Sequence, residues 1–128
     1  MKITAKKAAA VSAVKADVLV VPMPSTPDAS AGVLAGVDSA LGGRVARLVE
    51  RGDAKGRVGY ATLLDAGDGV KAAHVLLVGV GDGDAGSWRE AGMAAGSRAR
   101  DVGARTAAVG TDEDGAALAR ASARSEVE

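Results

Sequence analysis

The stretch HVLLVGVGDGDAGSWREAG, residues 74–92, contains the residue types and spacing closest to those of a ligand site. An aliphatic run ends in Gly79, Gly81 and Gly83, and helix-forming residues follow. A strand, a glycine turn and a helix in this order outline a loop that binds nucleotide phosphates, because glycines let backbone N–H groups approach a phosphate at a helix N-terminus. The alternative is a strand-to-helix turn with no ligand.

The details of this stretch favour the structural turn. A dinucleotide fingerprint has a third glycine where this chain has Asp84. Ser87 and Glu90 have the spacing of a capping box, which predicts that the helix begins at Trp88, far from Gly81. Asp82 and Asp84 also place negative charge where a pyrophosphate would lie. A Walker loop is excluded because no Gly-Lys-Ser/Thr follows. The phosphate-binding loop stays open as the second interpretation.

Acidic residues follow two consecutive predicted strands, and ligands of open α/β sheets bind at the rim where strands end. Carboxylates there are suitable for loose Mg²⁺ or Ca²⁺ binding, but solvated loops and helix N-terminal charge explain them as well. The single histidine, His74, has no serine or cysteine partner, so we predict no catalytic residue and no metal ligand. The candidate ligand-binding residues at the rim are Gly79, Gly81, Gly83 and Asp112.

The elements that would position this rim alternate between strands and helices. We predict strands near 17–22, 57–64, 73–80 and 104–110, with a first edge strand near 2–4 or 9–14, and expect the second and third of the four to form a hairpin. Helices are predicted over 32–41, 43–51 and 88–101, with another after Thr111. The order predicts an α/β fold of three layers, α/β/α, with a mixed, mostly parallel sheet. Residues 1–128 are expected to form one domain.

Composition limits the functional classes. The 16 basic and 16 acidic residues balance, so no net field attracts nucleic acid or a membrane surface, and we expect neither as a partner. Cysteine is absent and no apolar run is long enough to span a bilayer, which favours a cytoplasmic location. Alanine supplies 29 of the hydrophobic residues, and each contributes little to burial. The core is therefore thin, and we expect the domain to pack on a neighbour.

Three stretches together resemble the N-terminal domain of the leucine aminopeptidase family, the cytosolic two-metal aminopeptidases. They are DVLVVPM (17–23), VDSALGGRVARLVERGDAKGRVGYATLL (37–64) and HVLLVGVGDGDAGSWREAGMAAGSRARDVGARTAAVG (74–110). Their order and spacing carry the likeness across nearly the whole chain. The family often has a larger apolar residue at Ala54 and a polar one at Tyr60, departures that affect packing. The resemblance implies a macro-domain-like fold.

The resemblance also implies a division of labour. In the family a C-terminal catalytic domain follows this one and binds two divalent metals, Zn or Mn. The metal ligands and the Asn-Thr-Asp-Ala-Glu-Gly-Arg signature are not in these 128 residues, so no cofactor is expected here and no catalytic residue can be carried over. Family members form hexamers, in which this domain would pack on its own catalytic domain and support assembly. The sequence is either one domain of such an enzyme or a short protein. A stand-alone module that binds ADP-ribose or a related nucleotide is the competing hypothesis.

Overall fold

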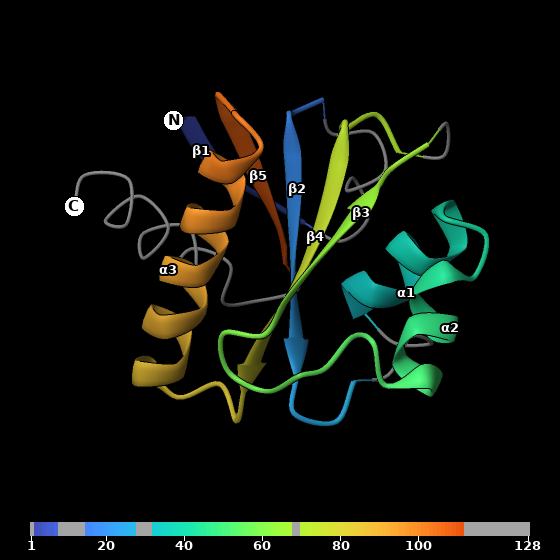
Figure 1. Ribbon diagram of the computed structural model, residues 1–128, viewed down its shortest axis with the longest axis vertical. Helices are drawn as coiled ribbons and strands as arrows, with labels where there is room; N and C mark the ends of the chain where they lie inside the picture. Colours follow the sequence, from blue (N-terminus) through green and yellow to red (C-terminus); the bar gives the residue numbers. More distant parts are fainter. Residues whose placement is uncertain (1, 8–14, 28–31, 68–69, 112–128) are drawn as a thin grey trace.

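The structure is a computed structural model that describes residues 2–7, 15–27, 32–67 and 70–111 (Figure 1). Its centre is a five-stranded sheet in the order β1-β5-β2-β4-β3. The strands are β1 (Lys2–Lys7), β2 (Val18–Pro24), β3 (Ala61–Asp65), β4 (His74–Gly81) and β5 (Thr106–Thr111).

The sheet is mixed and mostly parallel, as predicted. Strands β1, β5, β2 and β4 run in the same direction, and only β3 is antiparallel to its neighbour β4. The predicted hairpin is confirmed by the β3–β4 pairing, in which Ala61 lies opposite Val78 and Asp65 opposite His74. Because the parallel strands share a direction, the carboxyl ends of β2 and β4 meet at one edge of the sheet.

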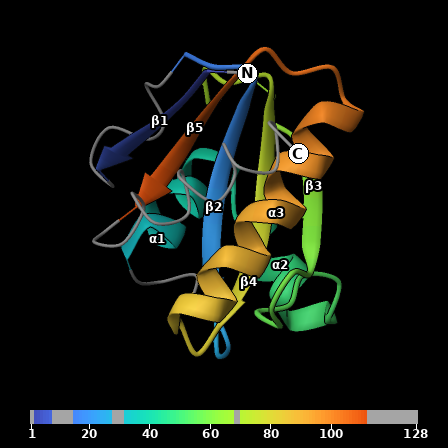
Figure 2. The same ribbon diagram turned by 90° about the vertical axis from the view of Figure 1, so that its left-hand side faces the viewer.

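Helices cover both faces of the sheet, which confirms the three-layer prediction. Helices α1 (Gly32–Ala40) and α2 (Arg44–Arg51) lie on one face, and α3 (Ala85–Asp101) lies along the other (Figures 1 and 2). The break between α1 and α2 falls at Gly42 and Gly43, where the sequence predicted it. Both glycines have left-handed backbone conformations, with φ values of 65° and 83°, which other residues rarely adopt.

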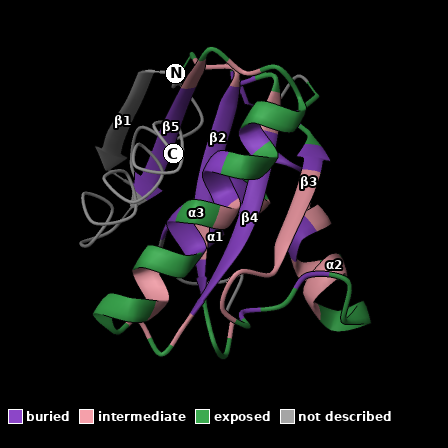
Figure 3. Cartoon of the chain, turned by 60° about the vertical axis from the view of Figure 1, so that its left-hand side comes forward, coloured by how far each residue is buried: buried purple, intermediate pink, exposed green. Residues whose placement is uncertain are grey.

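The central strands are buried on both faces, which explains their continuous aliphatic sequences (Figure 3). Along β2, Leu19, Val21 and Met23 pack toward α1 and α2, whereas Val18 and Val20 pack toward α3. Helix α3 contributes mainly small side chains to its contact with the sheet: the buried residues of this helix are Ala91, Gly92, Ala95, Gly96 and Ala99. These small residues let the helix lie close to the strands, so this side of the core is built largely from small side chains.

Two predicted element starts, those of α3 and β3, are corrected by the structure. Helix α3 begins at Ala85 rather than Trp88, because Asp84 and not Ser87 is its N-cap. Strand β3 begins at Ala61 rather than near 57, because the preceding residues form a turn in which the Tyr60 N–H donates to the Arg57 carbonyl. The predicted edge strand is β1. The helix predicted after Thr111 lies outside the described residues.

Candidate functional site

The glycine motif lies at the edge of the sheet where β2 and β4 end. Gly79 and Gly81 are the last glycines of β4, and Gly83 lies in the turn that leads to α3. The backbone of Ser25, just past β2, donates to the Gly81 carbonyl over 2.9 Å and joins the two strand ends. Gly79, Gly81 and Gly83 therefore lie at the strand ends, as the sequence predicted, whereas Asp112 lies outside the described residues.

The glycines of β4 make room for another segment of the chain. Residues 56–60 run beside the end of β4 and pair with it irregularly, in continuation of the β3–β4 hairpin. The Gly79 N–H donates to Tyr60, the Gly81 N–H donates to Gly56, and the Gly59 N–H donates to Gly79 over 3.0 Å. A Cβ atom on Gly79 would overlap the Arg57 carbonyl, and one on Gly81 would lie 2.5 Å from a methyl group of Val58. Close approach of two backbones therefore requires a glycine at position 79, whereas Gly81 leaves room for the Val58 side chain and has a left-handed φ of 58°.

The turn after β4 completes the connection to α3 without a ligand. The Gly83 N–H donates to the Val80 carbonyl over 3.0 Å. The Asp84 carboxylate accepts from the Ser87 N–H over 2.8 Å and so satisfies one amide of the first helical turn. Hydrogen bonds from the backbone N–H and the hydroxyl of Ser87 hold the pKa of the Asp84 carboxyl below its usual value. The N–H groups that a phosphate would use at Gly79, Gly81 and Gly83 thus already donate within the protein.

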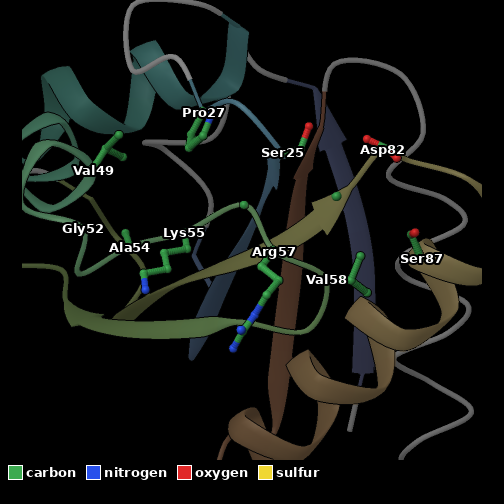
Figure 4. Close-up of a pocket in the computed structure, with 12 residues that line it drawn as sticks. Ser25, Pro27, Val49, Gly52, Ala54, Lys55, Arg57, Val58, Asp82 and Ser87 are labelled. Carbon is green, nitrogen blue, oxygen red and sulfur yellow. The ribbon is translucent and has the colours of Figure 1, made fainter.

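An open cavity of about 620 Å³ adjoins this rim (Figure 4). It is bounded by the ends of β2 and β4, the residues after α2 and the first turn of α3. Its lining is mostly apolar, with Pro27, Val49, Ala54 and Val58 contributing side chains. The sequence pattern marked Gly81 but none of these four, since they come from three segments that only the fold brings together.

The hydroxyl and carboxylate side chains of the cavity lie at one end of it. Ser25, Asp82 and Ser87 lie on the same side in the close-up, whereas Lys55 and Arg57 extend away from them (Figure 4). The charged ends of these two residues lie near the Tyr60 ring, with Lys55 Nζ 5.5 Å and Arg57 Cζ 5.8 Å from its centroid. The carboxylate of Asp82 is exposed, and no described residue forms an ion pair with it.

The opposite end of the sheet has a smaller hollow of about 270 Å³, lined by Asp17, His74 and Arg105 among others. The Asp17 carboxylate accepts from the N–H groups of Arg105 and Thr106 over 2.7 and 3.1 Å. These two hydrogen bonds hold the pKa of Asp17 below its usual value, and the one from Arg105 has the larger effect. The ring of His74 lies 3.6 Å from Asp65 across the hairpin. In this hollow the carboxylate of Asp17, directly before β2, links the chain to the start of β5.

Among residues 2–7, 15–27, 32–67 and 70–111, no three His, Cys, Asp or Glu side chains gather in a way that could hold a metal ion. Within those same ranges, no helix has the length and apolar character needed to cross a bilayer.

Comparisons with known proteins identify the same part of the same family. Residues 18–127 match the model of the cytosol aminopeptidase family, N-terminal domain. A probable cytosol aminopeptidase of Alkalilimnicola ehrlichii is 45% identical over 71 residues, which cover 53% of this chain and 14% of that protein. A second relative, from Stenotrophomonas maltophilia, is 50% identical over 46 residues, or 36% of this chain and 9% of the relative. The matches thus span only a small fraction of the relatives' length.

Solved structures agree on the fold. A mutant of tomato leucine aminopeptidase superposes with a TM-score of 0.74 at 23% identity, covering 100% of this chain and 28% of the other. The macrodomain of Mycobacterium tuberculosis DarG gives a TM-score of 0.70 at 11% identity, with 96% of this chain and 88% of the macrodomain covered. The macro-domain-like fold predicted from the sequence is confirmed. With residues 18–127 matching its N-terminal domain model, the chain belongs to the cytosol aminopeptidase family.

Proposed function

We propose that this chain is the non-catalytic N-terminal domain of a leucyl-aminopeptidase-like exopeptidase that removes N-terminal residues from peptides. The observation that carries the proposal is the family match over residues 18–127. In the two relatives described above, the matched segment makes up 14% and 9% of the whole protein. The remaining length of such an enzyme would hold the catalytic domain and its two divalent metals, Zn or Mn. There the metals would polarise the scissile carbonyl and activate a water molecule. The names of the relatives support a cytosolic location.

The domain's own role would be to pack on the catalytic domain and to support a homo-oligomer, a hexamer in the family. The alanine-rich contact between α3 and the sheet supports a domain of limited intrinsic stability. Met93 on α3 and Val102 at its C-cap keep 44% and 37% of their surface exposed, more than other large apolar side chains of the described ranges. Both are suitable contacts for a neighbouring domain.

A domain exchange tests this proposal. In the Alkalilimnicola ehrlichii relative, the matching N-terminal segment would be deleted in one variant and replaced by this chain in another. We expect the 128-residue chain alone to show no hydrolysis of leucine anilide with Mn²⁺ or Zn²⁺, and the replacement to be more stable and more fully assembled than the deletion. Metal-dependent turnover by the chain alone would contradict a non-catalytic role. Equal stability and assembly of the deletion and the replacement would contradict a supporting role.

A second function deserves a test because of the fold and the cavity. The macrodomain likeness and an open cavity at the strand ends favour a module that binds ADP-ribose or a related nucleotide through the rim of Gly79, Gly81 and Gly83. The internal hydrogen bonds of these glycines weigh against it. Calorimetric titration with ADP-ribose separates the two functions, since absence of heat at millimolar ligand removes the nucleotide hypothesis.

A further inference from the structure

The charge at the rim is opposite to that of a phosphate site. Asp84 already occupies the amide end of α3, so the positive end of the helix is neutralised by the chain itself. The remaining charged group on the polar side of the cavity is the carboxylate of Asp82, which no described residue pairs. Lys55 and Arg57 line the cavity but carry their charges toward Tyr60 and not toward Asp82 (Figure 4). This end of the cavity therefore favours a cation.

The rest of the cavity favours an apolar body. Pro27, Val49, Ala54 and Val58 bring aliphatic surface to the lining, and the volume of about 620 Å³ lies within the range of small-molecule pockets. The hydroxyls of Ser25 and Ser87 lie on the same side as Asp82 and add oxygen acceptors for N–H donors (Figure 4). A ligand with a cationic group at one end and an apolar body, such as an aliphatic primary amine, would match both parts of the cavity.

We propose that this cavity binds small aliphatic primary amines, with the ammonium group at Asp82 and the apolar chain against Val58. The proposal concerns a binding site only and does not depend on the aminopeptidase role. A primary ammonium has three N–H donors, which match the carboxylate of Asp82 and the two serine hydroxyls. Because Asp82 is solvent-exposed, screening weakens its attraction and we expect affinity in the millimolar range.

A set of ligands with one carbon skeleton tests the charge requirement. The 128-residue chain, labelled with ¹⁵N, would be titrated with isoamylamine, isoamyl alcohol and isovalerate at the same ionic strength. We expect saturable amide shifts at Gly81, Asp82 and Ser87 with the amine, at least tenfold weaker binding of the alcohol, and none of the anion. Methylammonium, which has the charge but little apolar surface, should bind at least tenfold more weakly than isoamylamine.

Protein variants test the assigned residue. Asp82→Asn should weaken isoamylamine binding about tenfold, whereas Asp101→Asn, which removes the same charge at the far end of α3, should leave it unchanged. The ligand series decides the matter even if a variant folds poorly. Binding of isovalerate, inorganic phosphate or ADP-ribose at these amides in preference to the amine would overturn the proposal. The absence of saturable amide shifts at 20 mM isoamylamine, roughly tenfold above a low-millimolar Kd, would also overturn it. Equal effects of Asp82→Asn and Asp101→Asn on isoamylamine binding would do the same.

Discussion

Replacing Gly79 with alanine tests whether the glycine motif exists for backbone packing. Gly79 has an ordinary φ value, so alanine adds no backbone strain of its own at this position. The added methyl group would overlap the carbonyl of Arg57 and the neighbouring backbone of Gly56. Since backbone cannot rotate away as a flexible side chain can, β4 and residues 56–60 must separate. Two hydrogen bonds between Gly79 and that segment, to Tyr60 and from Gly59, would be weakened.

The expected magnitude follows from these contacts. Overpacking a close contact costs about 1–3 kcal/mol, and each weakened hydrogen bond contributes roughly 0.5–1.5 kcal/mol. We therefore expect Gly79→Ala to lower the free energy of unfolding by about 3 kcal/mol, which for a chain of this size lowers Tm by roughly 10 °C. Urea unfolding followed by circular dichroism and by the fluorescence of Trp88, the single tryptophan, measures the loss.

Gly86→Ala is the matched control. Gly86 lies in the first turn of α3 with a normal φ, and a Cβ there would meet only a carboxylate oxygen of Asp84, at 3.5 Å. Alanine favours helix over glycine by up to about 1 kcal/mol, so this variant should be as stable as the parent chain or more stable. If the free energies of unfolding of Gly79→Ala and the parent chain differ by less than about 0.5 kcal/mol, the range expected for neutral surface substitutions, Gly79 is not required for backbone packing. Equal destabilisation of Gly79→Ala and Gly86→Ala would contradict the same role.

Three other substitutions have expected outcomes. Leu77→Ala, at a β4 side chain only 1% exposed in the core cluster shared with α1 and α2, should lower the free energy of unfolding by about 2–5 kcal/mol in the same urea assay. Ala95→Leu should destabilise the chain by about 1–3 kcal/mol, because α3 lies too close to the sheet to accept a larger side chain, whereas Ser97→Leu at an exposed position of the same helix should have little effect. Asp84→Ala should lower Tm at pH 7. The pKa of Asp84 is depressed in the folded chain, so the stability it contributes is present above its ordinary pKa and is lost as the pH falls through the folded value. The Tm values of Asp84→Ala and the parent chain should therefore converge in acid, and a difference independent of pH would contradict the carboxylate's role.

Local patterns predicted the layers of this fold because each pattern has a local cause. The aliphatic runs at 18–21 and 75–78 become central strands because both of their faces are covered by helices. The pair Gly42-Gly43 separates two helices because both residues adopt left-handed conformations. The hairpin followed from a short, turn-rich connection between two apolar runs. The order β1-β5-β2-β4-β3 was not predicted, because strand neighbours are set by packing between segments far apart in sequence.

The start of α3 shows where local rules compete. Asp84 and Ser87 are both good N-cap residues, and the capping-box spacing of Ser87 and Glu90 favoured the later start. In the structure the N-cap is Asp84, and Gly83, with a φ of 76°, turns the chain immediately before it. The earlier start removes one sequence-based objection to phosphate binding at the glycines. The same cap then introduces a stronger objection, since its carboxylate occupies the end of the helix.

The meaning of the glycine motif depends on a segment more than twenty residues earlier in the chain. From the sequence, Gly79 and Gly81 are equally consistent with a ligand that approaches the backbone and with a second strand of protein that does so. Gly56 carries a related signal, because a Cβ there would overlap the Pro24 carbonyl at the end of β2. Residues 56 and 57 thus lie against two other backbones, and each of these two close approaches depends on a glycine, Gly56 in one and Gly79 in the other. A phosphate loop needs glycines on one segment only. Glycines placed on both sides of a predicted hairpin end therefore indicate backbone contact within the protein, and Gly79→Ala distinguishes the two cases by its effect on stability in the absence of any ligand.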